Sequence, residues 1–186
     1  MRDEFAALSG CSAIWGLVRE RSVDQYRERT TADAAVDRKP VSLSVDTCDL
    51  IQWEQGVPHF KNGNGGDIYL YPGFIIYRAA KGAFSLISSH DLQVHAVMVD
   101  FHEEWAIPSD SRTVGYDWAK QNKDGSRDRR FVNNYQIPVV QYGRLSLKSD
   151  TGLWEEFLFS APERLKNFVN VWAAFESSFD DARASA

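Results

Sequence analysis

The fold is decided by residues 139–179, which read VVQYGRLSLKSDTGLWEEFLFSAPERLKNFVNVWAAFESSF. Apolar and polar residues alternate along Val139–Lys148, and less regularly along Leu153–Ser160, as expected for half-buried antiparallel strands. The four residues between them, 149–152, end in Gly152, at a position where a short hairpin loop favours a positive φ. These residues predict a β-hairpin.

A helix is predicted directly after the hairpin, over residues 161–180. Ser160 and Glu163 have the spacing of a capping box, in which the Ser160 side chain accepts a bond from the Glu163 amide. We expect the apolar stripe of this helix to pack on a sheet. A helix lying on an anionic membrane would need Lys and Arg on its polar face, where this one carries acidic residues. The stripe recurs at helical spacing: Leu165, Phe168, Val169, Trp172, Phe175 and Phe179.

The whole pattern predicts an α+β fold, a mostly antiparallel β sandwich or partly open barrel closed by the C-terminal amphipathic helix. We expect one domain over 1–186. Residues 1–40 would hold a short helix, a first strand and a charged, partly mobile loop, Arg19–Lys39, with six basic and five acidic residues. Residues 41–160 would form a β meander that includes a short strand at 50–53. Residues 161–180 would form the helix.

Charge is distributed unevenly along the chain. The net charge is −5, which argues against nucleic-acid binding by the chain as a whole. Residues 120–148, however, hold seven basic and two acidic residues, a local charge of +5, so the rest carries −10. The two cysteines have no zinc-site spacing, no apolar run has transmembrane length, and the start lacks a signal-peptide pattern. We therefore expect a cytoplasmic protein without a transmembrane segment or cofactor.

The basic stretch 123–135 is the candidate binding site. Guanidinium groups here can clamp phosphate or carboxylate, and aromatic rings can stack on a base. The candidate ligand-binding residues are Lys123, Arg127, Arg129, Arg130 and Tyr135, with Phe131 as a second stacking ring.

A purely structural interpretation of the same stretch stays open. Asp124-Gly125 would make a turn, Asp128 would pair with an arginine, and Asn133 and Asn134 would satisfy loop backbone groups. A mixture of both interpretations would bury and pair Arg129 and leave Arg127 and Arg130 exposed.

Motifs for catalysis are weak. There is no Gly-x-Ser-x-Gly elbow, the glycine-rich residues 62–66 lack the P-loop lysine, and no second histidine follows His102-Glu103-Glu104 at zinc-protease spacing. His95, Asp100 and His102 could assemble a metal site, but the favoured interpretation is that they are surface or half-buried strand residues. We expect no catalytic residues and no metal.

Residues 124–149, continuing to Glu156, resemble a segment found in uncharacterised bacterial proteins. The hairpin Ile68–Tyr77 and the segment Asp91–Val94 look similar to the preceding elements of that group, so the likeness covers about residues 65–160. No activity is established for the group. More loosely, the strands-then-helix order is similar to pleckstrin-homology-like domains, which implies an inward-facing Trp172 on the closing helix.

The sequence thus predicts a non-enzymatic protein-interaction or regulatory module whose partner is another protein. One alternative is a binder of nucleic acid or another phosphate-containing ligand that uses the basic stretch 123–135. A second alternative is an enzyme of unrecognised type near His95 and His102.

Overall fold

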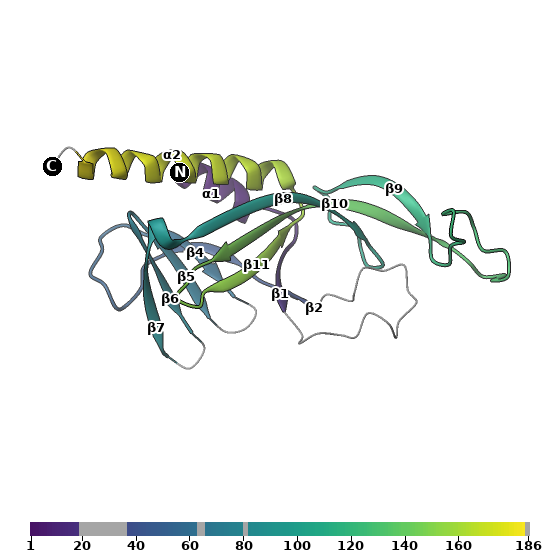
Figure 1. Cartoon of the computed structure of the whole chain (residues 1–186), viewed down its shortest axis with the longest axis horizontal. Coiled ribbons are helices and arrows are strands. Elements are labelled where there is room, and N and C mark those ends of the chain that lie inside the picture. The colour runs from purple at the N-terminus through teal and green to yellow at the C-terminus, as the bar shows by residue number, and fades with distance from the viewer. Residues whose placement is uncertain (19–36, 63–65, 80–81, 185–186) are drawn as a thin grey trace.

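The computed structural model describes residues 1–18, 37–62, 66–79 and 82–184 (Figure 1). Helices α1 (Arg2–Ser9) and α2 (Pro162–Ala184) accompany two antiparallel sheets and a short 3₁₀ turn, Ser89–Asp91. The larger sheet has the order β2-β1-β11-β10-β8, with β9 paired to the first part of β10. Its strands are β1 (Ile14–Val18), β2 (Asp37–Pro40), β8 (Gln93–His102), β9 (Arg112–Trp118), β10 (Gln136–Lys148) and β11 (Trp154–Phe159).

The smaller sheet is a meander in chain order, β3-β4-β5-β6-β7. Its strands are β3 (Leu43–Asp46), β4 (Val57–Lys61), β5 (Asp67–Tyr71), β6 (Phe74–Arg78) and β7 (Phe84–Ser88). The predicted α+β class is confirmed as a sandwich-like pair of sheets with a C-terminal helix. The described residues do not close into a barrel.

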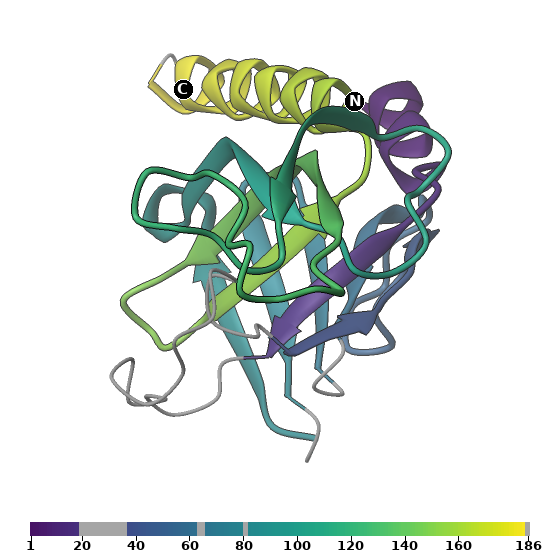
Figure 2. The ribbon, with the colours of Figure 1, turned by 90° about the vertical axis from the view of Figure 1, so that its right-hand side faces the viewer.

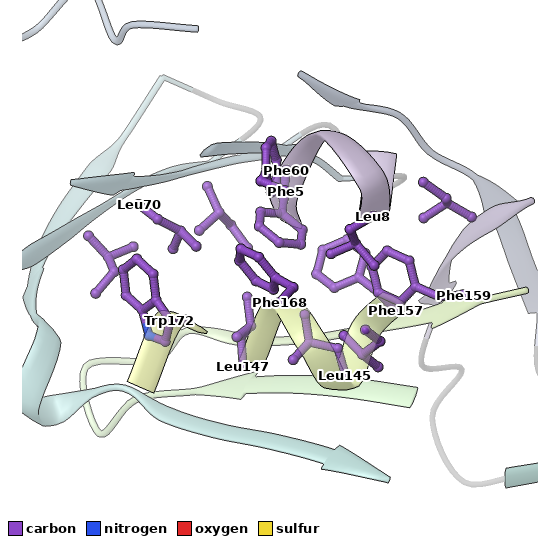
Figure 3. Close-up of a cluster of buried hydrophobic side chains, with 14 of the residues drawn as sticks. Phe5, Leu8, Phe60, Leu70, Leu145, Leu147, Phe157, Phe159, Phe168 and Trp172 are labelled. Atoms are coloured by element: carbon purple, nitrogen blue, oxygen red, sulfur yellow. The ribbon is translucent and has the colours of Figure 1, made fainter. Parts of the chain in front are cut away.

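The main core joins both sheets and both helices (Figure 3). Phe5 of α1 meets Phe60 of β4 and Phe168 of α2, with ring centroids 5.6 and 5.5 Å apart. Phe60 also contacts Phe157 of β11, 5.4 Å away. Because large aromatic rings from four elements share one cluster, burial of this cluster ties the layers together.

The predicted hairpin is confirmed as β10 and β11, and Gly152 has the expected positive φ of 100°. Helix α2 packs the first part of its stripe into the core as predicted: Leu165, Phe168 and Trp172 are buried there, and Trp172 is only 5% exposed. The predicted capping box is not formed among the described residues: Ser160 has no hydrogen bond with Glu163, and its hydroxyl accepts the amide of Ala13 at 3.0 Å. That bond links the start of α2 to β1 instead of closing the helix on itself.

Two further predictions fail. Residues 50–53 are turn and bend, not a strand. Residues 37–39, expected in the charged loop, belong to β2. Arg38 is only 8% exposed there, because its side chain lies in a site lined by an acidic residue and aromatic rings. The rest of that predicted loop, 19–36, lies outside the described residues.

Candidate functional site

An arm extends from the body of the sandwich (Figure 1). It consists of β9, the first half of β10 and the connecting segment 119–135, which we call the arm loop. Strand β10 is 13 residues long, so its second half pairs with β11 while its first half pairs with β9. The register shifts between Val139 and Val140, and such an irregularity bends a strand. Figure 2 views the molecule from the side on which the arm loop lies.

The arm loop is organised around Asp128. This carboxylate is 3% exposed and accepts bonds from the amide, Nε and Nη2 of Arg130, the last at 2.6 Å. The side-chain and backbone bonds from Arg130 lower the pKa of Asp128. Arg130 is therefore the arginine that pairs with Asp128.

Polar side chains satisfy much of the loop backbone, as the structural interpretation predicted. Asn134 accepts the amide of Lys120 at 3.0 Å and donates to its carbonyl at 2.7 Å. Asp124 accepts the amide and hydroxyl of Ser126, and Gly125 adopts the positive φ of 80° that the predicted turn requires. Asn133 makes no comparable bond within the described chain.

The five predicted binding residues share this loop but differ in their surroundings. The guanidinium of Arg127 lies 5.1 Å from the ring centroid of Trp118 and donates to the carbonyl of Val132. Lys123 and Arg129 are exposed and form no ion pair among the described residues. Tyr135 is 58% exposed. The expected mixture is thus wrong: Arg130, not Arg129, is the paired arginine, because Asp128 lies within reach of it.

A surface depression of about 470 Å³ runs along the arm loop. Three apolar residues in its lining are exposed: Val132 by 85%, Tyr135 by 58% and Phe131 by 46%. Lys120 and Arg130 line it beside them. We call these five residues the arm patch. Large apolar side chains gathered on an exposed projection are typical of surfaces that bind a partner.

A buried charge network lies at the base of the arm, and sequence reasoning missed it. The guanidinium of Arg38 donates two bonds to Glu103, at 2.9 and 2.6 Å, and the Tyr142 hydroxyl donates a third at 2.7 Å. Three rings surround the guanidinium, those of Trp15, Phe101 and Trp105, with centroids 4.6, 4.9 and 4.7 Å away. No sequence signal separates Glu103 from its exposed neighbour Glu104; only burial does.

This network shifts the protonation of its members. Burial raises the pKa of Glu103, but hydrogen bonds from Arg38, Tyr142 and the Trp105 amide outweigh burial and lower it below the usual value. Burial and the Glu103 carboxylate raise the pKa of Tyr142. Both carboxylate oxygens are occupied by donors, so we assign the network to structure and not to proton transfer.

The metal-ligand set considered from sequence does not assemble. His102 Nε2 lies 2.7 Å from Asp117 Oδ2 of β9, the strand on the other side of β10, whereas His95 lines a groove beside α2. The part of the chain that is described holds no group of three metal-ligating side chains.

A serine, a histidine and an aspartate meet on the smaller sheet. Ser44 Oγ lies 2.9 Å from His59 Nδ1, and Asp67 Oδ1 lies 3.2 Å from Nε2, outside hydrogen-bond geometry. The imidazole is 6% exposed and stacks flat on Tyr69, with centroids 4.3 Å apart. Burial raises the pKa of Tyr69 to about 12. We assign His59 to packing between strands, because its stacked ring is fixed in place.

Comparison with family models, curated proteins and solved structures found no match to this chain. The resemblance to uncharacterised bacterial proteins therefore stays a prediction. Over the described residues, no helix combines the length and apolarity needed to cross a membrane.

Proposed function

We propose that the protein is a cytoplasmic, non-enzymatic interaction module that binds an acidic segment of another protein through the arm patch. One observation carries the proposal: Phe131, Val132 and Tyr135 are exposed together on a projecting loop whose own hydrogen bonds are largely internal. The two cysteines, both free, are compatible with a reducing compartment.

Charge favours an acidic partner. The arm loop holds five basic and two acidic residues, a charge of +3, while the rest of the chain carries −8. Arg130 and Arg127 are engaged by Asp128 and Trp118, which leaves Lys120, Lys123 and Arg129 exposed for carboxylates of a partner. Electrostatic complementarity of this kind steers association and suppresses wrong partners.

Nucleic acid and phosphate ligands are less well supported. Two of the three arginines that were expected to clamp phosphate are already engaged within the loop. The pleckstrin-homology-like likeness is supported only by the inward-facing Trp172 on a C-terminal helix, so phosphoinositide vesicles serve as one probe. The enzyme alternative is supported by no observation at His95 or His102.

Site-specific photo-crosslinking tests the proposal. A photoreactive phenylalanine analogue would replace Val132 in one variant and Phe84, which is 60% exposed on β7, in the control. In living cells, we expect the Val132 probe to trap a defined protein with an acidic segment and the Phe84 probe to leave it untouched. Adding Lys123→Glu and Arg129→Glu should abolish that adduct. The matched pair Lys39→Glu and Arg144→Glu, at exposed residues of the body, should not.

Four outcomes would overturn the proposal. They are no adduct at Val132, an equal adduct at Phe84, a nuclease-sensitive adduct, and capture that survives the charge reversals. Retention on phosphoinositide vesicles that is lost with Lys123→Glu and Arg129→Glu would instead assign the loop to phosphate.

A further inference from the structure

Strand β8 is an open edge of the larger sheet. Within the described residues its strand partner is β10 alone. It is ten residues long, whereas the other edge strands are shorter: β2 and β3 have four residues each, β7 has five and β9 has seven. Proteins protect exposed edges with short strands, Pro, Lys or bulges. The sequence QVHAVMVDFH contains neither Pro nor Lys, and its register with β10 is continuous.

The open backbone groups of β8 can be assigned from the ladder. The amide of Glu103 donates to the Pro138 carbonyl at 2.9 Å, and hydrogen-bonded pairs alternate along an antiparallel ladder. Because the register is continuous, every second residue of β8 counted back from Glu103 forms backbone hydrogen bonds with β10. The N–H and C=O groups of Val94, Ala96 and Met98 therefore point away from the sheet. No bond elsewhere in the described chain occupies them.

A groove of about 440 Å³ runs between this edge and α2. Leu165 and Val169 of the helix line one side, and Val94 and Ala96 of β8 line the other while packing against the main core. Met98 lines the groove and is 45% exposed. An edge strand beside an apolar groove suits an extended peptide, whose backbone pairs with the edge while alternate side chains enter the groove.

The charge of the groove indicates which charge the bound peptide should carry. Among the residues that line it, Lys166 is the single one with a formal charge. Its Nζ lies 4.0 Å from Glu163 Oε2, a long distance for an ion pair, and its side chain is 62% exposed. A carboxylate on the incoming strand would complement this cation.

We propose that β8 and the groove beside α2 bind an extended segment of another protein by strand addition. Its backbone pairs with Val94, Ala96 and Met98, its apolar side chains at alternate positions enter the groove, and a carboxylate lies against Lys166. This surface is separate from the arm patch, and the proposal does not depend on the arm patch being functional.

A random peptide library displayed on phage, selected on the full chain, provides the test. We expect enriched sequences to alternate apolar residues and to carry an acidic residue. Upon addition of a synthetic copy, the amides of Val94, Ala96 and Met98 should become protected from hydrogen exchange. The amide of Val97, already in the ladder, should change little.

Three changes separate strand addition from other binding. Ala96→Pro removes an outward N–H without removing a ladder bond, as edge strands allow, and should weaken binding at least tenfold. Lys166→Glu should also weaken binding at least tenfold, although it leaves the backbone of β8 unchanged. N-methylation of those peptide amides that face β8 should abolish binding, while methylation of the intervening amides should not. Lys123→Glu with Arg129→Glu should leave binding unchanged.

The proposal is overturned if selection on the wild-type protein enriches no peptide sequence relative to selection on the Ala96→Pro protein. It also fails if bound peptides leave the amides of Val94, Ala96 and Met98 unprotected. The same holds if N-methylation of the peptide amides that face β8 weakens binding no more than N-methylation of the intervening amides. A concentration-dependent dimer that Ala96→Pro dissociates would assign the edge to a second copy of the chain, and would equally overturn it.

Discussion

Single residues show how strongly burial changes the role of a charge. Glu103 and Glu104 are neighbours, yet Glu103 is 2% exposed and bonded to Arg38 and Tyr142, while Glu104 faces solvent. Breaking a buried ion pair by removing one charge is costly, because the remaining charge is left without compensation. We therefore expect the Arg38–Glu103 pair to hold β2 and the segment after β8 together more firmly than the exposed ion pairs of the described residues do.

Replacing this buried carboxylate should make stability less sensitive to acid. Since the pKa of Glu103 is lowered in the folded state, its charge stabilises the fold above its unfolded pKa of about 4.3. That stabilisation is lost as the pH falls through the lower, folded pKa. Glu103→Gln should cost about 3–5 kcal/mol at pH 7. Denaturant unfolding from pH 7 to pH 3 should show this difference shrinking. Glu104→Gln should follow wild type, and a difference for Glu103→Gln that stays constant with pH would contradict the assignment.

At the scale of elements, the position of α2 depends on a glycine in β10. A Cβ added at Gly143 would lie 2.9 Å from Leu165 Cδ2 and 3.0 Å from Pro162 Cα. The helix therefore crosses the strand so closely that a side chain at position 143 has no room. Arg164 holds the same end of α2 to α1, donating to the Gly10 carbonyl at 2.6 Å. These contacts set the wall of the groove beside β8.

Adding one methyl group at this crossing should destabilise the protein. Gly143→Ala should cost about 1–3 kcal/mol, because the first turn of α2 must shift to relieve the contact. Gly115→Ala in β9 is the matched control: nothing lies within 4 Å of its Cβ, and we expect no loss of stability. Chemical denaturation of both variants measures the difference. Equal midpoints would show that α2 is not held this closely against β10.

For the whole molecule, the body and the arm loop are expected to be separate units of stability. The main core draws on both sheets and both helices but on no residue of 119–135. The bonds around Asp128 and Asn134 stay inside that loop. The packed core thus lies in the sandwich, while the arm loop carries the exposed side chains of Phe131, Val132 and Tyr135. In such an arrangement, the residues that bind a partner can change without disturbing the fold.

Removal of the arm loop should leave the body folded. Trp118 and Gln136 are partners across β9 and β10, so an Asn-Gly turn can join them in place of residues 119–135. We expect the melting temperature to change by less than about 4 °C, the effect of about 1 kcal/mol in a chain of this size. Calorimetry and circular dichroism test this expectation. Loss of the cooperative transition would show that the loop contributes to the core.

The local elements could be predicted from the amino-acid sequence alone. The β10–β11 hairpin, the α2 stripe with Trp172 and the turns at Gly125 and Gly152 follow from periodicity and backbone preference, which act between residues a few positions apart. The α+β class follows from the order of these elements. The sequence also located a basic loop, though not which of its arginines would be free.

The surroundings of each polar group, in contrast, depend on how distant segments pack in the folded protein. Arg38 meets Glu103 across 65 positions, and Tyr142 meets Glu103 across 39. The division of the strands between two sheets, which left β8 as an edge beside α2, likewise depends on pairings distant in sequence. The physical reason is that burial and pairing are properties of the packed chain. The same Glu or Arg is a solvated surface charge or a buried ion pair according to which distant segments surround it.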